Sequence, residues 1–269
     1  MTQAEKGRAF QALHQRDRAF PIPNPWDAGS ARLLAHLGFE ALATTSAGYA
    51  YSTGRRDHGV PRNDMLAHAA AIVSATGLPV SADLENGYGD SPEDAAETVR
   101  LAAAAGLVGC SIEDAAFDRV YPHDLAADRI RAAAEAAHAL PFPFTLTARA
   151  ENFITGHPDL ADTIIRLQSF QEAGADVLYA PGLTTLEEVA QVVRSVDRPV
   201  NVLGPMPGSQ WSVAQLSALG VRRISIGGAF YRAAMGGFLR AARELSIHGT
   251  FEFKEQMATS PDLRGMFGQ

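Results

Sequence analysis

The 269-residue chain contains one cysteine, Cys110, and two lysines, Lys6 and Lys254. A single cysteine excludes an internal disulfide framework, which fits a reducing compartment. A Schiff-base aldolase needs a lysine at its active site. Because both lysines lie near the ends of the chain, the sequence argues strongly against that class of enzyme.

Long apolar runs and basic stripes are absent as well. No apolar run reaches the roughly 18 residues of a membrane span, and the first ten residues lack the apolar centre of a signal peptide. The net charge is -7, with acidic and basic residues mixed along the chain. This pattern indicates binding to neither nucleic acid nor membranes, so we expect a cytoplasmic protein with a small-molecule ligand.

Short apolar runs alternate with helical stretches eight times along the chain. The runs predict strands at Phe20–Pro23, Phe39–Ser46, Pro79–Glu85, Val108–Asp114, Phe144–Glu151, Val177–Gly182, Pro199–Gly204 and Arg223–Gly228. Helices are expected after them, at residues 28–37, 62–76, 91–105, 125–139, 158–173, 185–194, 212–219 and 229–246. Eight such units predict one α/β domain over residues 1–269, a (β/α)₈ TIM barrel with a tail from residue 248. An open doubly wound sheet is the rival, but no G-x-G-x-x-G follows an early strand.

In such barrels the active site lies at the carboxyl ends of the strands. Alternate residues of a strand face the same side. By this rule the interior face receives the polar residues at the ends of the third, fourth and fifth strands, namely Ser81, Asp83, Glu85, Ser111, Glu113, Thr145, Thr147, Arg149 and Glu151. Cys110 falls on the opposite face, against the helices.

Carboxylates that converge at one barrel mouth raise each other's pKa or require a cation. Oxygen ligands suit a hard ion such as Mg²⁺ or Mn²⁺. Arg149 is suited to clamp a substrate carboxylate, or else serves as a structural counter-ion of Glu113 or Glu151. The segment Ser46-Ala47-Gly48 can offer a hydroxyl and backbone N–H groups to an anion. The alternative is that each acid merely ends a strand or caps a helix.

Two further kinds of site have weaker support. None of the histidines has zinc-ligand spacing, and His58 and His123, on loops near the expected site, are interpreted as structural. The glycine-rich segments 204–208 and 227–228 lie where barrels often bind phosphate. A phosphate site would leave the carboxylates unexplained.

Over residues 8–246 the chain resembles the isocitrate lyase/phosphoenolpyruvate mutase superfamily. The matching segments are Pro25–Ala28, Thr45–Gly48, Arg56–Gly59, Asp83–Gly89, Ser111–Asp114 and Thr147–Arg149. The resemblance implies that Asp83 binds Mg²⁺ directly. It also implies that Asp57, Glu85 and Glu113 hold metal-bound waters, although the family usually has Asp in place of Glu85. Ser46, with the backbone of Ala47 and Gly48, would bind the carboxylate of a 2-oxo acid. Arg149 would hold a substrate anion, and it forms the implied catalytic set with Asp57 and Glu113.

The same resemblance implies a homotetramer in which neighbours exchange their eighth helix. One departure from the family matters for function. The lyases carry a K-K-C-G-H-type loop whose cysteine is an acid/base, whereas residues 115–123 contain neither lysine nor cysteine. Cys110 cannot substitute, because it precedes the strand end and faces away. The chain therefore resembles the decarboxylase branch of the superfamily.

The resulting hypothesis is a Mg²⁺-dependent carbon–carbon lyase that acts on a small 2-oxo acid through a metal-stabilised enolate. Decarboxylation of an oxaloacetate-type substrate needs the fewest additional groups. The alternatives are a lyase of substituted malates, with Tyr121 or His123 as the acid, and phosphonopyruvate or phosphoenolpyruvate chemistry. A non-catalytic protein that binds 2-oxo acids is the alternative from another class.

Overall fold

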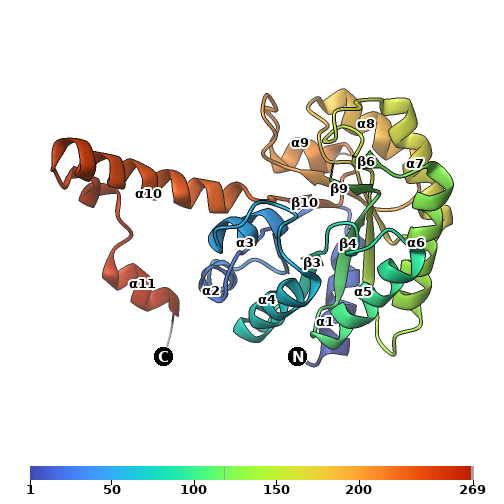
Figure 1. The fold of residues 1–269 in the computed structure, drawn as a ribbon, viewed down its shortest axis with the longest axis horizontal. Coiled ribbons are helices and arrows are strands. Elements are labelled where there is room, and N and C mark those ends of the chain that lie inside the picture. The colour runs from blue at the N-terminus through green and yellow to red at the C-terminus, as the bar shows by residue number, and fades with distance from the viewer. Residues whose placement is uncertain (118, 268–269) are drawn as a thin grey trace.

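Eight parallel strands form the centre of the molecule (Figure 1). The computed structural model describes residues 1–117 and 119–267. The strand order is β1-β10-β9-β8-β7-β4-β3-β2. The backbone N–H of Ala43, in β2, donates to the carbonyl of Pro23, just after β1, at 3.0 Å. This bond joins the two edges of the sheet, so the predicted (β/α)₈ barrel is confirmed.

All eight predicted strand runs contain a barrel strand. The strands are β1 (Phe20–Ile22), β2 (Leu42–Ala43), β3 (Val80–Asp83), β4 (Gly109–Glu113), β7 (Thr145–Arg149), β8 (Val177–Tyr179), β9 (Val200–Leu203) and β10 (Arg223–Ser225). They are shorter than the runs, because the chain leaves the sheet at each carboxyl end to form the loops of the barrel mouth.

The eight predicted helices are present too. They are α2 (Ala28–His36), α4 (Arg62–Ala75), α5 (Pro92–Ala104), α6 (His123–His138), α7 (Leu160–Glu172), α8 (Leu186–Ser195), α9 (Val213–Ala218) and α10 (Ala229–His248). Elements that the sequence analysis did not predict are α1 (Gln3–His14), α3 (Ser46–Ser52), the hairpin of β5 (Ala115–Ala116) and β6 (Arg119–Val120), the 3₁₀ helix η1 (Glu252–Gln256) and α11 (Ser260–Phe267).

Local chemistry fixes the start and the end of α5. The Ser91 hydroxyl accepts from the Asp94 backbone N–H, the Asp94 carboxylate accepts from the Ser91 N–H, and Pro92 occupies the first turn. The helix ends before Gly106, which has a left-handed φ of 91°. These signals place the segment that carries the candidate metal-binding residues Asp83 and Glu85 directly before the start of α5.

The strand residues that alternate with the polar ones pack outward against the helices, as predicted. Ala82, Ile112, Leu146 and Ala148 are buried in the main hydrophobic core, together with Cys110. Burial raises the pKa of the Cys110 thiol. Cys110 is therefore a core residue without access to the barrel mouth.

Helix α10 extends away from the barrel (Figure 1). None of its 20 residues is buried, and Phe238 and Ile247 are 64% and 69% exposed. A mainly apolar groove of about 740 Å³ lies beside its first turns, between Pro205, Trp211, Leu216 and Phe230. None of the helices in the described residues is long and apolar enough to cross a membrane.

Candidate active site

Asp83, the last residue of β3, lies between two groups that were predicted to bind substrate. Its Oδ1 is 2.9 Å from Arg149 Nη1. Its Oδ2 accepts from the hydroxyl of Ser46 at 2.8 Å and from the Ser46 backbone N–H at 3.2 Å. The structure therefore brings together the predicted metal ligand, the predicted substrate clamp and the predicted carboxylate-binding serine.

Arg149 contacts two more carboxylates. Its Nη1 lies 2.9 Å from Glu113 Oε1, and its Nε lies 2.7 Å from Glu151 Oε1. Its guanidinium also stacks on the Tyr179 ring at 5.1 Å. Burial raises the pKa of Glu113, and the adjacent guanidinium opposes that rise. The charge of the carboxylates raises the pKa of Arg149 well above its ordinary value, although burial opposes it.

Strand register explains this convergence. Glu113 of β4 lies directly opposite Arg149 of β7 in the parallel pairing. The residue after Glu113, Asp114, accepts from the Glu151 backbone N–H at 2.7 Å and is paired with buried Arg166 at 3.1 Å. This buried network fixes the ends of both strands, and so the positions of the groups that they carry.

Glu85 and Asp57 complete the acid cluster from two loops. The strand alternation that we applied to Glu85 is interrupted, because β3 ends at Asp83 and Glu85 has a left-handed φ of 51°. Its carboxylate is still buried near Asp83, and one oxygen, Oε1, has no hydrogen-bond partner among the described residues. Burial raises the pKa of Glu85, and burial together with the charge of Asp83 raises the pKa of Asp57.

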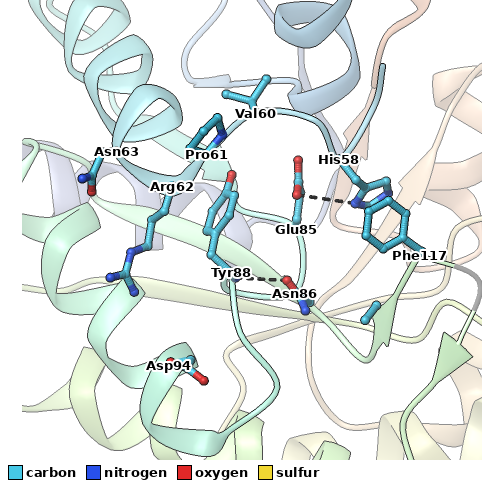
Figure 2. Close-up of a pocket in the computed structure, with 11 residues that line it drawn as sticks. His58, Val60, Pro61, Arg62, Asn63, Glu85, Asn86, Tyr88, Asp94 and Phe117 are labelled. Atoms are coloured by element: carbon cyan, nitrogen blue, oxygen red, sulfur yellow. Dashed lines mark hydrogen bonds and ion pairs between the residues drawn. The ribbon is translucent and has the colours of Figure 1, made fainter. Parts of the chain in front are cut away.

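His58, which we interpreted as structural, is part of this cluster. Its Nδ1 lies 3.4 Å from Glu85 Oε2 (Figure 2). The Glu85 carboxylate, with Glu113 and Asp57 nearby, raises the pKa of His58 to about 9. The longer side chain of Glu85 is what carries a carboxylate to His58. The signal that could have identified this histidine is its place beside Asp57 in the Arg56–Gly59 loop, one of the segments that match the family.

No group of three or more His, Cys, Asp or Glu side chains in the described residues is close enough together to bind a metal ion directly. Arg149 and His58 instead supply positive charge between the acids. A divalent ion that keeps several waters, as Mg²⁺ usually does, needs few direct ligands. The all-oxygen donors and the Oε1 of Glu85, which has no hydrogen-bond partner among the described residues, fit such an ion.

The Ser46-Ala47-Gly48 segment differs from the expected strand end. It forms the first turn of α3, and the Gly48 N–H is bound by the hydroxyl of Thr45, the N-cap residue, at 3.2 Å. Two of the expected anion-binding groups, the Ser46 hydroxyl and N–H, bind Asp83. A substrate carboxylate could bind the Ser46 hydroxyl and N–H only by displacing the Asp83 carboxylate from them.

A cavity of about 510 Å³ opens beside Glu85 (Figure 2). Its wall is formed by the loop before α4 with the first residues of that helix, by the loop after β3 with Asp94 of α5, and by Ala116 and Phe117. The non-glycine residues with left-handed φ in the described chain, namely His58, Glu85, Tyr88 and Phe117, all line this cavity. Such backbone strain costs on the order of 1–3 kcal/mol per residue and clusters at functional sites.

Two residues proposed as acids for the lyase alternative have other partners. The Tyr121 hydroxyl donates to Asp90 at 2.5 Å and accepts from Asn86 at 2.8 Å, and the whole side chain is buried. His123 Nε2 lies 2.6 Å from Asp162. Neither group is free to protonate a substrate carbon in this arrangement.

The closed barrel, with its polar groups at the carboxyl ends of the strands, has the architecture of a (β/α)₈-barrel enzyme. The chain belongs to the phosphoenolpyruvate phosphomutase family, whose model matches residues 10–246. The structure is similar to a crystal structure of a candidate lyase/mutase from Burkholderia cenocepacia, with 57% identity, a TM-score of 0.97, and 99% and 97% of the two chains covered.

Curated relatives include an uncharacterised protein from Mycobacterium tuberculosis, 35% identical over 88% of this chain and 89% of its own. An oxaloacetate decarboxylase from Pseudomonas putida is 29% identical over 84% of this chain and 80% of its own. A 2-methylisocitrate lyase from Escherichia coli has the same 29% identity, over 72% and 68%. The decarboxylase and the lyase thus have the same percentage identity to this chain, and the decarboxylase matches a longer part of it.

Proposed function

We propose that this protein is a Mg²⁺- or Mn²⁺-dependent carbon–carbon lyase that acts on a small 2-oxo acid. Decarboxylation of an oxaloacetate-type substrate is the first candidate reaction. The observation that carries the proposal is the convergence of Asp83, Glu113 and Arg149 at the barrel mouth. Asp57 and Glu85 extend the same acidic cluster.

Arg149 supplies the substrate contact. Its guanidinium already binds three carboxylates, so a substrate carboxylate can replace one of them without creating a new kind of contact. Burial beside Tyr179 limits the orientations of the guanidinium. This residue therefore binds and orients the acid group of the substrate.

The carboxylates supply the binding site for the cation. A divalent ion held there would withdraw electrons from the 2-oxo group as the C3–C4 bond breaks. The electron pair of that bond moves toward C2, CO₂ leaves, and C3 then takes a proton from solvent. No residue has to remove a proton to start this reaction, which fits a loop without lysine or cysteine.

A lyase of substituted malates is the second candidate, and the cavity of about 510 Å³ favours it. Carbon dioxide needs only a small part of that space. The lyase reaction, however, needs a base to take the hydroxyl proton and an acid to protonate the enolate carbon. Tyr121 and His123 have other partners, which argues against this reaction. A protein that binds 2-oxo acids without catalysis is excluded by any measurable turnover.

A substrate panel separates these candidates. Oxaloacetate, 3-methyloxaloacetate and 2,3-dimethylmalate are each incubated with enzyme and Mg²⁺, and 2-oxo acid products are measured by a coupled dehydrogenase. Because oxaloacetate decarboxylates spontaneously with metal ions, Asp83→Asn serves as the background and Asp64→Asn, a surface change, as the matched control. Turnover of the malate alone would replace the decarboxylase proposal with the lyase.

We also propose a homo-oligomer, as the resemblance implied. Support comes from α10, which has no buried residue, and from the apolar groove beside it. An exposed helix of this kind is stabilised when a second copy covers its apolar side.

A further inference from the structure

The cavity beside Glu85 contains four charged groups, and three of them are engaged. His58 is paired with Glu85. The Asp94 carboxylate accepts from the Ser91 hydroxyl at 2.6 Å and from its N–H at 3.0 Å, which caps α5. The fourth group is Arg62, the first residue of α4.

Arg62 has no carboxylate within 4.0 Å among residues 1–117 and 119–267. Within the described residues, its side chain makes one hydrogen bond, a long one from Nη1 to the hydroxyl of Thr98 at 3.4 Å. That hydroxyl already donates to the carbonyl of Gly87 at 2.7 Å. The side chain is partly buried in the cavity wall, where Figure 2 shows it between Asn63 and Asp94.

Hydrogen bonds from Ser91, together with the charges of Arg129 and Arg62, lower the pKa of Asp94, so Asp94 is the nearby carboxylate that Arg62 influences. Arg62 still forms no ion pair with it or with any other described carboxylate, and a guanidinium in this situation in a cavity wall is suited to bind an anion. The cavity also has the volume for a ligand, since about 510 Å³ falls within the range of small-molecule sites, about 300–1,000 Å³. A single water occupies about 30 Å³ in the liquid, so this space far exceeds what a departing CO₂ requires. Glu85 belongs both to the wall of this cavity and to the acid cluster.

We propose that this cavity binds a second carboxylate of an extended 2-oxo diacid, and that Arg62 is the residue that recognises it. The substrate would then carry its distal carboxylate at least one carbon farther from the 2-oxo group than oxaloacetate does. This inference rests on the proposed function, because it takes the 2-oxo end of the substrate to lie at Asp83 and Arg149. Arg62 determines which substrate binds and takes no part in the bond cleavage.

The test compares ligands that differ only at the distal end. Binding of oxalate, 2-oxoglutarate, 2-oxoadipate and the uncharged-tail analogue 2-oxohexanoate is measured by titration calorimetry in the presence of Mg²⁺. The proteins are the wild type, Arg62→Ala, Arg62→Gln and Arg62→Lys. Arg55→Ala is the matched control, because Arg55 lies on the loop that leads into α4, is paired with Asp64 and does not line the cavity. Thermal melting verifies that each variant is folded, and Arg62→Gln replaces Arg62→Ala if the latter is not.

The wild type should bind the best-fitting diacid at least about tenfold more tightly than 2-oxohexanoate, as expected for a hydrogen bond to a charged group. Arg62→Ala and Arg62→Gln should abolish that preference and leave oxalate binding within about twofold of the wild type. Arg62→Lys should retain part of the preference, and Arg55→Ala all of it. If the Arg62 variants bind diacids as the wild type does, or if diacid and monoacid bind equally, the inference is wrong while the proposed function stands. If the wild type fails to bind oxalate with Mg²⁺, the proposed function fails, and the inference fails with it.

Discussion

Asp83 and Arg149 form a 2.9 Å ion pair at the barrel mouth, and each is also bound to a second partner that the proposed chemistry requires. Asp83 accepts a hydrogen bond from Ser46, and Arg149 forms an ion pair with Glu113. A bound cation would replace Arg149 as the partner of Asp83, and a bound substrate anion would replace Asp83 as the partner of Arg149. The protein thus neutralises its own site with groups that substrate and metal can replace.

Arg149→Lys should lower kcat/KM on the order of 100-fold. Lysine keeps the charge but loses the planar fork that binds two acceptors at once. Steady-state kinetics with the best substrate of the panel measures the effect. Arg194→Lys is the control, because Arg194 forms an exposed pair with Glu187. An unchanged kcat/KM in Arg149→Lys would assign Arg149 a purely structural role.

Metal affinity should fall in a graded way across the acid cluster. Asp83→Ala should abolish Mn²⁺ binding measured by calorimetry or electron paramagnetic resonance, since it removes the direct ligand. Asp57→Asn and Glu113→Gln should weaken binding by roughly 10–100-fold, the usual range for groups beyond the direct ligands. Asp64→Asn, at an exposed pair with Arg55, is the control. Equal Mn²⁺ affinity in Asp83→Ala and the wild type would contradict the assignment.

His14 should make the protein sensitive to acid. Burial, with the nearby charge of Arg223, lowers the pKa of His14 from 6.5 to about 3. Between those two pH values the unfolded chain binds a proton at this histidine and the folded chain does not, so the free energy of unfolding falls as pH falls from about 6.5 toward 3. The loss is about 1.4 kcal/mol per pH unit for one group.

Urea unfolding of the wild type and His14→Gln at pH 6.5 and pH 5 measures this contribution. The gap in unfolding free energy between the two proteins should shrink by about 2 kcal/mol over that interval. His157→Gln, at an exposed position, should leave the pH dependence unchanged. A constant gap between wild type and His14→Gln would show that His14 does not titrate as its burial demands.

The assembly should be a tetramer of about 114 kDa, four copies of the 28.6-kDa chain. Light scattering at micromolar concentration measures the mass. Phe238→Asp, which places a charge on the exposed side of α10, should reduce it. Ile165→Asp, at a residue of α7 that is 54% exposed, should not. A wild-type monomer at this concentration would refute the proposed exchange of α10.

The sequence predicted the barrel and the group at strands β3, β4 and β7, because two simple regularities apply there. Alternation places Asp83 and Glu113 on the inner face, and parallel register places Glu113 beside Arg149. Glycines and helix caps then divide the chain into eight units. Short-range rules were sufficient wherever a residue stands on a regular strand or helix.

The same rules were insufficient for loop residues. His58 and Glu85 both have left-handed φ, so neither alternation nor helical spacing predicts where their side chains lie. The Tyr121 hydroxyl has its partners, Asn86 and Asp90, in the loop after the neighbouring strand β3, about 30 residues earlier in the chain. Arg62 was counted only as the start of a helix, because its place in the cavity wall is visible only when the surrounding loops are in place.

The most direct test of the central claim is the rate of product formation from the best substrate with and without chelator. After exhaustive treatment with EDTA the wild type should lose its activity, and Mg²⁺ or Mn²⁺ should restore it, while Asp83→Asn should remain at the background rate with metal present. Full activity in the chelated wild-type enzyme would contradict the account.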